Sequence, residues 1–405
     1  MKAVIVPPAN AIRFEWVTGH QEFLALKAQW ELLGSSAVQT VFLTYDWLAA
    51  WLENLAGDAE LHVMTAWEGE RLVAALPLFG SATAGRGRRW AIMGTGTLTP
   101  NHLDIIADPE SLESARDGFV KMLLDAASDW DVLELDKLPA DSDTAETLTA
   151  AFEEAGFVTM RAVTATCPYC DLPATGEEYY LSRKKQIRKT IRQVRRWYEE
   201  RPEERVLSLA KTEEEALEAF GQLVRMHQSR WKGKGYPGAF ADPRVVRFHE
   251  QVVRAASRRG YLRIYTLTDG GEMAAVSYNY RVGPTVQGYL SSFDFRWAET
   301  SPGVLLRIYV MEESIAEGAR RFDFLEGTES YKAAWCTGGR ENLRLLVFNR
   351  TLAGSAARLK HAADETTVLV ARKLVPPDLR ERTVKALARR KAAWPGAEGG
   401  SDSGD

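Results

Sequence analysis

Three strands in a row, joined by two tight turns, are the feature of this sequence that most restricts its fold. The stretch YLRIYTLTDGGEMAAVSYNYRVGPTVQGYLSSFD, residues 261–294, is rich in β-branched and aromatic residues. It is interrupted only by Asp269-Gly270-Gly271 and Gly283-Pro284. Turns this short connect antiparallel neighbours, so the stretch predicts a three-stranded antiparallel sheet.

The elements predicted around this sheet follow a definite order. Helices are predicted where apolar residues recur at three- and four-residue spacing, and strands where short runs favour extended backbone. The order is a strand at 206–212, helices at 213–231 and 245–260, the three strands, a helix at 304–318, a strand at 320–327, a short helix at 329–335 and a strand at 341–349.

The first part of the chain predicts a second mixed sheet with helices. Its elements are helices at 21–34, 44–57, 111–129 and 145–157, a hairpin at 61–80, and strands at 88–94, 102–108, 130–138 and 157–170. A chain of 405 residues is too long for one ordinary core. The two sets of elements therefore predict two domains followed by an extension.

Composition narrows the class of protein. Hydrophobic residues make up 45% and charged residues 26% of the chain, as in soluble globular proteins. No apolar run reaches the roughly 18 to 20 residues of a membrane helix. The N-terminus MKAVIVPPANAIRF lacks the apolar core and cleavage site of a secretory signal, so we expect a cytoplasmic protein.

Cysteine usage agrees with this interpretation. Cys167, Cys170 and Cys336 are too few for a disulfide framework. Cys167 and Cys170 have CxxC spacing, but no second pair or suitably spaced histidines complete a zinc site. We therefore expect buried or half-buried thiols and no metal.

A strongly basic stretch, SRKKQIRKTIRQVRRW at 182–197, contains eight Lys or Arg and no acid. Apolar residues between Ile187 and Tyr198 recur at helical spacing, so the stretch predicts an amphipathic helix that docks by one face. A net charge of -4 argues against a dedicated nucleic-acid-binding protein. The basic face is either solvated or attracts an anionic substrate, and in the second case Arg188 and Arg192 are the binding candidates.

A helix start at Ser301-Pro302-Gly303 follows the third strand. Proline suits the first helical turn because its missing N–H would have no intrahelical partner there. The remaining N–H groups and the helix dipole favour an anion, so Ser301, Pro302, Gly303 and Val304 are phosphate-binding candidates. Taken alone, the tripeptide is more typical of an ordinary helix start.

Three antiparallel strands, this helix start, one strand and a short helix bearing Tyr331-Lys332 follow the order of GNAT acyltransferases. With RWKGKGYPGAF, GGEMAAVSYNY, FDFRWAETSPGVLL and FDFLEGTESYKAAW, the chain resembles the double-domain GNAT acyltransferases grouped with the cellulose-biosynthesis protein CelD. It is more distantly similar to the FemABX aminoacyl transferases. The resemblance covers roughly residues 12–350. The chain departs from the usual glycine-rich Q/R-x-x-G-x-G/A loop of GNAT enzymes, having only Ser301-Pro302-Gly303 at that place.

The resemblance implies an α/β fold with mixed α+β sheets in two tandem GNAT-like domains. The domains that we expect are an N-terminal, non-catalytic GNAT-like domain at 12–170, a joint with the basic helix at 171–200, a catalytic GNAT domain at 201–350, a helical extension at 351–392 and a disordered tail at 393–405.

The resemblance also implies an N-acyltransferase that uses acyl-CoA as co-substrate. The amine of a sugar, peptide or small metabolite attacks the thioester directly, without an enzyme nucleophile. A backbone N–H of the third strand around Ser291, Ser292 and Phe293 is expected to stabilise the oxyanion.

Four side chains are candidates for the proton transfers. Tyr331 is expected to protonate the leaving thiolate, and Asp294 or Glu326 to accept the proton of the amine. Lys332 is a candidate for binding the oxyanion or an anionic acceptor. The alternative is that Asp294 caps the loop and Lys332 is simply exposed.

Other polar residues have both a functional and a structural interpretation. Arg230, Trp231 and Lys232 could hold the acceptor or a CoA phosphate, or could simply end a helix. His102 and Asp104 could reach a cleft between the domains, and a strand histidine with ordinary partners is the simpler expectation. Asp323 is expected to orient its neighbours.

Two alternatives to an acyl-CoA-dependent enzyme remain open. A FemABX-like transferase would take its acyl group from aminoacyl-tRNA, and would then bind tRNA with a steep salt dependence. A GNAT-shaped binding protein in a biosynthetic pathway would have lost catalysis. DNA is not an expected partner.

Overall fold

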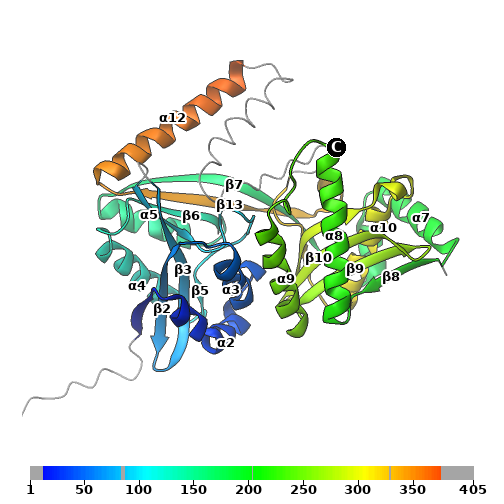
Figure 1. Ribbon diagram of the computed structural model, residues 1–405, viewed down its shortest axis with the longest axis horizontal. Helices are drawn as coiled ribbons and strands as arrows, with labels where there is room; N and C mark the ends of the chain where they lie inside the picture. Colours follow the sequence, from blue (N-terminus) through cyan, green and yellow to red (C-terminus); the bar gives the residue numbers. More distant parts are fainter. Residues whose placement is uncertain (1–11, 84–86, 203, 328–329, 375–405) are drawn as a thin grey trace, which may run out of the picture.

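The computed structural model describes residues 12–83, 87–202, 204–327 and 330–374, and Figure 1 shows two halves side by side. The elements of the N-terminal half are β1 (Arg13–Val17), α1 (His20–Ala25), α2 (Lys27–Ala37), η1 (Val41–Leu43), α3 (Tyr45–Asn54), β2 (Glu60–Glu68), β3 (Arg71–Thr83), β4 (Gly87–Ile92), β5 (Ile106–Ala107), α4 (Leu112–Asp125), β6 (Val132–Pro139), α5 (Thr144–Glu154) and β7 (Val158–Asp171). Those of the C-terminal half are α6 (Gly176–Ser182), α7 (Lys185–Glu199), β8 (Arg205–Leu209), α8 (Glu213–Gly233), α9 (Pro243–Arg258), β9 (Leu262–Asp269), β10 (Glu272–Val282), β11 (Thr285–Phe293), η2 (Phe295–Thr300), α10 (Pro302–Ala316), β12 (Arg321–Asp323), α11 (Ser330–Trp335), β13 (Gly338–Phe348) and α12 (Leu352–Leu374).

Side-chain caps explain where several helices begin. Thr44, Thr212 and Asp242 each accept a hydrogen bond from a backbone N–H in the first turn of α3, α8 and α9. At α8, Glu215 also reaches back to the N–H of Thr212 and completes a capping box. These contacts satisfy N–H groups that have no partner within the helix. Pro302 opens α10, as the sequence predicts.

The strands of the described residues form one 13-stranded sheet. Its order is β1-β2-β3-β4-β6-β13-β7-β12-β11-β10-β9-β8, and β5 pairs with β3. The sheet is mixed, because β4 runs parallel to β6 and β11 runs parallel to β12 while the other neighbours are antiparallel. The predicted fold class, with mixed sheets and helices, is confirmed.

The two halves exchange strands. β13 comes from the C-terminal half but lies between β6 and β7, pairing Phe348 with Val132 of β6 and with Val158 of β7. In turn, the end of β7 pairs with β12, where Asp171 lies opposite Arg321. Figure 1 shows β7 and β13 running together from one half to the other. Each half thus needs a strand of the other to complete its sheet, and the exact domain boundaries stay a prediction.

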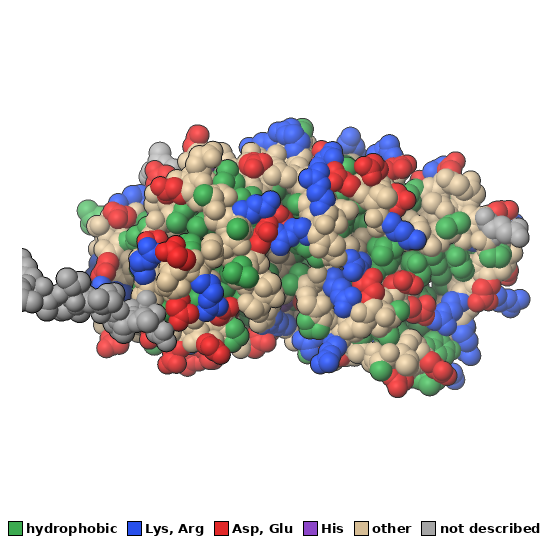
Figure 2. Space-filling view, turned by 90° about the horizontal axis from the view of Figure 1, so that it is seen from below, with side chains coloured by type: hydrophobic (Ala, Val, Ile, Leu, Met, Phe, Trp, Pro, Cys, Tyr) green, Lys and Arg blue, Asp and Glu red, His purple; other side chains and the backbone are tan. Residues whose placement is uncertain are grey.

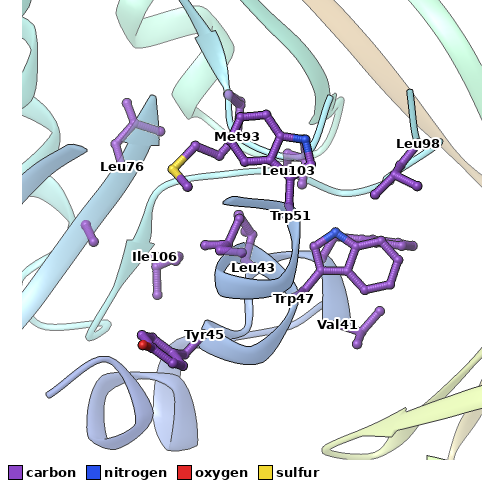
Figure 3. Packing of buried hydrophobic residues seen from close by; sticks show 14 of the residues in the cluster. Val41, Leu43, Tyr45, Trp47, Trp51, Leu76, Met93, Leu98, Leu103 and Ile106 are labelled. Carbon is purple, nitrogen blue, oxygen red and sulfur yellow. The ribbon is translucent and has the colours of Figure 1, made fainter. Parts of the chain in front are cut away.

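Aromatic packing also joins the halves. The ring of Trp47, on α3, lies 4.8 Å from that of Phe248 on α9 and 6.2 Å from that of Tyr280 on β10. Figure 3 shows Trp47 and Trp51 projecting from α3 into an apolar cluster that includes Leu98 and Leu103. A fully buried tryptophan of this kind contributes a large apolar area to the contact between the halves.

Two local predictions are wrong in detail. The helix predicted at 21–34 is divided into α1 and α2. The strand predicted at 102–108 is paired only at Ile106–Ala107. The reason is that His102 has a left-handed backbone, with φ of 58°, which is incompatible with an extended strand.

The helical extension begins as expected. α12 occupies the first part of the range predicted for it, and residues 375–405, with the predicted tail at 393–405, lie outside the described residues. In the part of the chain that the structure describes, no helix combines the length and the apolar character needed to span a membrane.

The exchanged strands predict that the halves unfold together. Leu345 of β13 is buried and pairs with β6 and β7, so Leu345→Ala should lower the free energy of unfolding by about 2 to 5 kcal/mol. Leu359→Ala, at an exposed position of α12, is the control and should change it by less than about 0.5 kcal/mol. Urea unfolding followed by fluorescence and circular dichroism should show one shared transition. Two transitions, with only one shifted by Leu345→Ala, would contradict strand exchange.

Candidate functional site

The parallel strands β11 and β12 part near the middle of the sheet. They are paired only at Thr285 with Arg321, Val286 with Phe322 and Gln287 with Asp323. β11 continues to Phe293, and no strand of the described residues pairs with that edge beyond Gln287. An unpaired strand edge presents backbone N–H and C=O groups to whatever lies beside it. The predicted oxyanion residues Ser291, Ser292 and Phe293 lie in this unpaired part.

A β-bulge distorts β11 at the same place. Its pairing with β10 shifts between Tyr278, opposite Leu290, and Asn279, opposite Gly288, so Tyr289 is an extra residue. Bulges bend a strand and change the direction of its backbone groups, and they are frequent next to active sites. The bulge therefore marks the part of β11 most suited to hold a reacting carbonyl.

A buried histidine holds the bulge from behind. The Tyr289 hydroxyl lies 3.2 Å from Nε2 of His249 on α9. Burial lowers the pKa of His249 from 6.5 to about 3, so its ring is neutral at physiological pH. This contact connects α9 to the bulge, and sequence reasoning missed it because a histidine on an amphipathic helix carries no distinct signal.

The predicted anion site at the start of α10 has few free donors. Ser301 adopts a left-handed backbone, with φ of 55°, and Pro302 has no N–H. The N–H groups of Val304 and Leu305 both donate to the carbonyl of Ser301, at 3.0 and 3.3 Å. The helix start therefore offers a phosphate fewer N–H groups than a glycine-rich turn does.

Asp294 lies at the end of β11 and caps η2. Its carboxylate accepts from the backbone N–H of Arg296 at 2.9 Å and pairs with the guanidinium of the same residue at 2.9 Å. The hydrogen bond from Arg296 lowers the pKa of Asp294, which weakens it as a base. A cavity of about 510 Å³ lies beside it, lined among others by Met226 and Phe293. The geometry thus favours the capping role, one of the two that the sequence leaves open.

Five polar residues meet where β12 ends, and we call them the junction cluster: Asn101, His102, Cys167, Asp323 and Asn342. His102 Nε2 lies 2.9 Å from Asp323 Oδ2, and its Nδ1 lies 3.0 Å from Asn342 Oδ1. Asn101 Oδ1 accepts from Asn342 Nδ2 at 3.1 Å and from Cys167 Sγ at 3.2 Å. All five are buried. Since buried polar groups need partners, the cluster is specific to this docking of the two halves.

The junction cluster adjoins the predicted residues Glu326 and Lys332. Lys137, at the end of β6, places Nζ 2.5 Å from Oε2 of Glu326. Lys332 is buried on α11, and its Nζ donates to the carbonyls of Phe324 at 3.2 Å and Glu326 at 3.0 Å. The alternative that Lys332 is exposed is therefore wrong. Tyr331 lies in the same helix, and its side chain is outside the described part of the structure.

The thiols follow the sequence prediction. Cys167 and Cys170 are buried, Cys336 is half-buried, and all three are free. Burial raises the pKa of the Cys167 thiol, and the nearby carboxylates of Asp323 and Glu326 raise it further. A thiol in this state is not an activated nucleophile.

The predicted acceptor residues lie on other elements. Arg188 and Arg192 project from α7, and Arg230, Trp231 and Lys232 lie in the last turn of α8. Among the described residues, no hydrogen bond or ion pair joins any of them to the junction cluster. Figure 2 shows Lys and Arg interspersed with Asp and Glu on the face that it draws. Within the described residues, none of the five pairs with the carboxylate of Glu326, which contacts Lys137.

Lys137, Asn101 and Asn342 are site residues that the sequence did not reveal. Each comes from a different segment, and only the sheet topology brings them to the end of β12. A lysine that ends a predicted strand is too common a feature to single out.

Comparison with known proteins agrees with this architecture. Residues 185–333 match a family model described as an acetyltransferase (GNAT) domain. The solved structure of FemX has a TM-score of 0.56 at 9% identity, over 81% of this chain and 96% of FemX. A C-terminal DUF2156 domain from Agrobacterium fabrum has a TM-score of 0.52 at 13% identity, over 85% of this chain and 96% of that domain. The structure of L-PGS from Bacillus licheniformis has a TM-score of 0.50 at 14% identity, over 82% of this chain and 95% of L-PGS. No curated protein matches the chain in sequence.

These likenesses show the fold. The GNAT-like architecture expected from the sequence is confirmed, with the matched domain in the C-terminal half. Membership of the CelD-like group stays a prediction.

The neutral His249 predicts an acid-sensitive fold. Its pKa is about 3 when folded and 6.5 as the ordinary value, so between these values the unfolded chain binds more protons and stability falls as the pH drops. At pH 4.5 this residue should cost about 2 to 3 kcal/mol relative to pH 6.5. His249→Phe should reduce the loss by that amount in urea unfolding at the two pH values. Equal losses in the two proteins would contradict a neutral, buried His249.

Proposed function

We propose that the C-terminal half transfers an acyl group from acyl-CoA to a primary amine. The observation that carries this proposal is the bulged, unpaired edge of β11 beyond its last pair with β12, Gln287 with Asp323. An extended chain bearing amide groups, such as the pantetheine arm of CoA, can pair with such an edge as an added strand would. The thioester carbonyl would then lie against a backbone N–H near Ser291, Ser292 and Phe293.

The chemistry needs few parts. The amine nitrogen attacks the thioester carbon, and the oxygen that becomes negative accepts a hydrogen bond from β11. Collapse of the tetrahedral species breaks the C–S bond, and Tyr331 donates a proton to the departing thiolate. Glu326 accepts the proton that the amine loses, directly or through water. We assign this role to Glu326 because it lies just beyond the end of β12, where β12 parts from β11, whereas the carboxylate of Asp294 caps η2 through the backbone N–H of Arg296.

Contacts with two lysines hold Glu326 just beyond the end of β12. Lys137 pairs with its carboxylate, and the backbone carbonyl of Glu326 binds the buried ammonium group of Lys332. Lys332 also bonds to Phe324, which holds α11 against the end of β12. The start of α11, where Tyr331 lies, is thereby fixed near the candidate base.

In the N-terminal half two parallel strands, β4 and β6, also part, but here another segment of the same half bonds to β6 beyond the last pair. β4 and β6 are parallel and paired only from Arg89 to Ala91 on β4. Beyond this point Leu103 donates its N–H to the carbonyl of Lys137 at 2.8 Å, and its side chain is fully buried. We infer that this half is non-catalytic and supports the other.

Aminoacyl-tRNA is the second candidate donor. Two observations favour it: Pro302 reduces the N–H groups available to the CoA pyrophosphate, and α7 exposes Lys185, Lys189 and Arg192 on its surface. A polyanion could contact such a face. The fold shared with FemX is compatible with either donor. We place either reaction in the cytoplasm and in a CelD-like family as part of the same proposal.

Substitution of the base and acid tests the mechanism. Glu326→Gln should lower kcat by about 100- to 10,000-fold, and Tyr331→Phe should act in the same direction, because each removes a proton-transfer group. Glu218→Gln is the matched control, since Glu218 is exposed on α8. The assay follows release of the CoA thiol from a panel of acyl-CoAs with amine acceptors. Full activity of Glu326→Gln would contradict the assignment of the base.

Ligand stabilisation identifies the donor. A ligand at 100 times its Kd adds about 2.7 kcal/mol to the free energy of unfolding, which raises the melting temperature visibly. We expect stabilisation by acyl-CoA of one chain length and none by bulk tRNA. Stabilisation by tRNA alone would transfer the proposal to the second donor, and stabilisation by neither would favour a binding protein.

A further inference from the structure

His102 reaches from the N-terminal half into the C-terminal sheet. It lies in the connection between β4 and β5, on a left-handed backbone with φ of 58°, and its ring is buried between Asp323 and Asn342. A residue other than glycine adopts this backbone at a cost, so it persists where surrounding contacts impose it. The contacts of the His102 ring with Asp323 and Asn342 are therefore candidates for what imposes this backbone.

Neighbouring amides determine how the ring bonds. Asn101 Nδ2 donates to the carbonyl of Thr99 at 3.2 Å, a group that can only accept, so its Oδ1 faces Asn342 Nδ2. Asn342 consequently turns its own Oδ1 toward Nδ1 of His102, and that nitrogen carries a hydrogen. At the other nitrogen, Nε2 lies 2.9 Å from a carboxylate oxygen of Asp323, and a proton must lie between them.

Asp323 transmits this contact to the proposed base. Its second oxygen, Oδ1, accepts from the backbone N–H of Leu325 at 2.8 Å. Leu325 has a left-handed backbone, with φ of 55°. It therefore changes the direction of the chain immediately before Glu326. The carboxylate of Asp323 thus bridges His102 and the turn that sets the direction of Glu326.

The residue after His102 holds the partner of that base. Leu103 donates its N–H to the carbonyl of Lys137, and Lys137 pairs with Glu326 at 2.5 Å. Two consecutive residues of the N-terminal half therefore fix both members of the Lys137–Glu326 pair, one through Asp323 and the other through the backbone.

We propose that His102 is a positioning residue for acyl transfer, acting through Asp323 and Leu325 to hold Glu326 at the parting of β11 and β12. The inference rests on the proposed function. His102 is buried, touches none of the reacting atoms and transfers no proton to them. Displacement of a reacting group by about 1 Å can cost about 100-fold in rate, so loss of this support should reduce turnover rather than donor binding.

The test uses the full-length protein with His102→Asn. Asparagine tolerates a left-handed backbone but is too short to reach both Asp323 and Asn342. We expect kcat to fall about 100-fold with the donor KM nearly unchanged, and the Leu325 amide to exchange its hydrogen at least about tenfold faster. His62→Asn is the control, because His62 is mostly buried, stacks on Trp90 and lies outside the junction cluster.

Asp323→Asn separates positioning from proton transfer. An asparagine there can donate from Nδ2 to His102 and accept from Leu325 with Oδ1, so it keeps both contacts. We expect it to retain kcat within about threefold and to keep the Leu325 amide protected. Should His102→Asn fail to fold, Asp323→Ala, which removes both contacts, can be compared with Asp323→Asn, which keeps them. The same difference in kcat and in exchange at Leu325 is then expected between these two variants.

Two results would overturn the proposal. One is that His102→Asn matches His62→Asn in kcat and in exchange at Leu325. The other is that Asp323→Asn is as inactive as His102→Asn, which would make Asp323 a proton carrier. If no donor gives turnover with the natural sequence, the proposed function is wrong. Whether His102 holds the turn is then tested by the exchange rate of the Leu325 amide, which does not depend on activity.

Discussion

The exchange of β7 and β13 is the constraint on which the rest of this structure depends. Each strand starts in one half and completes the sheet of the other, so the ends of β12 and β6 are brought to the same place. Because strand pairing brings these ends together, the connection between β4 and β5, which carries His102, can reach Asp323. A pair of domains joined only by a linker would not hold buried polar groups together across their contact, because each unpaired group would cost free energy.

The two halves use the same parting of parallel strands in different ways. In the N-terminal half Leu103 bonds to the end of β6 beyond the last pair of β4, whereas in the C-terminal half β11 is bulged and its edge facing β12 is unpaired beyond Gln287. His102, next to Leu103, extends this division of roles, because it bonds to Asp323 at the end of β12. In the proposed function, acyl transfer belongs to the open half, and the other half supplies surrounding residues such as His102, Leu103 and Lys137.

Much of the fold could be predicted from the sequence, because local patterns determine most helices and strands. The meander at 261–294 and the order of elements after it have the predicted form. Strand exchange could not be predicted, since alternation says which face of a strand is buried but not which strand lies beside it. For the site, the sequence singled out Glu326 and Lys332 but not Lys137, which pairs with Glu326, or Asn342, which bonds to Asn101. Pairing between distant segments places both of these residues.

In the proposed function, an acyl donor binds along β11 where it leaves β12. A crystal structure of the protein with a CoA thioether, in which a methylene replaces the reactive carbonyl, would show whether it does. We expect the pantetheine arm to pair with the backbone between Gly288 and Phe293, with the sulfur facing the start of α11. A thioether bound in the N-terminal half, or in the cavity between α6 and α10 that Arg195 and Glu312 line, would contradict it.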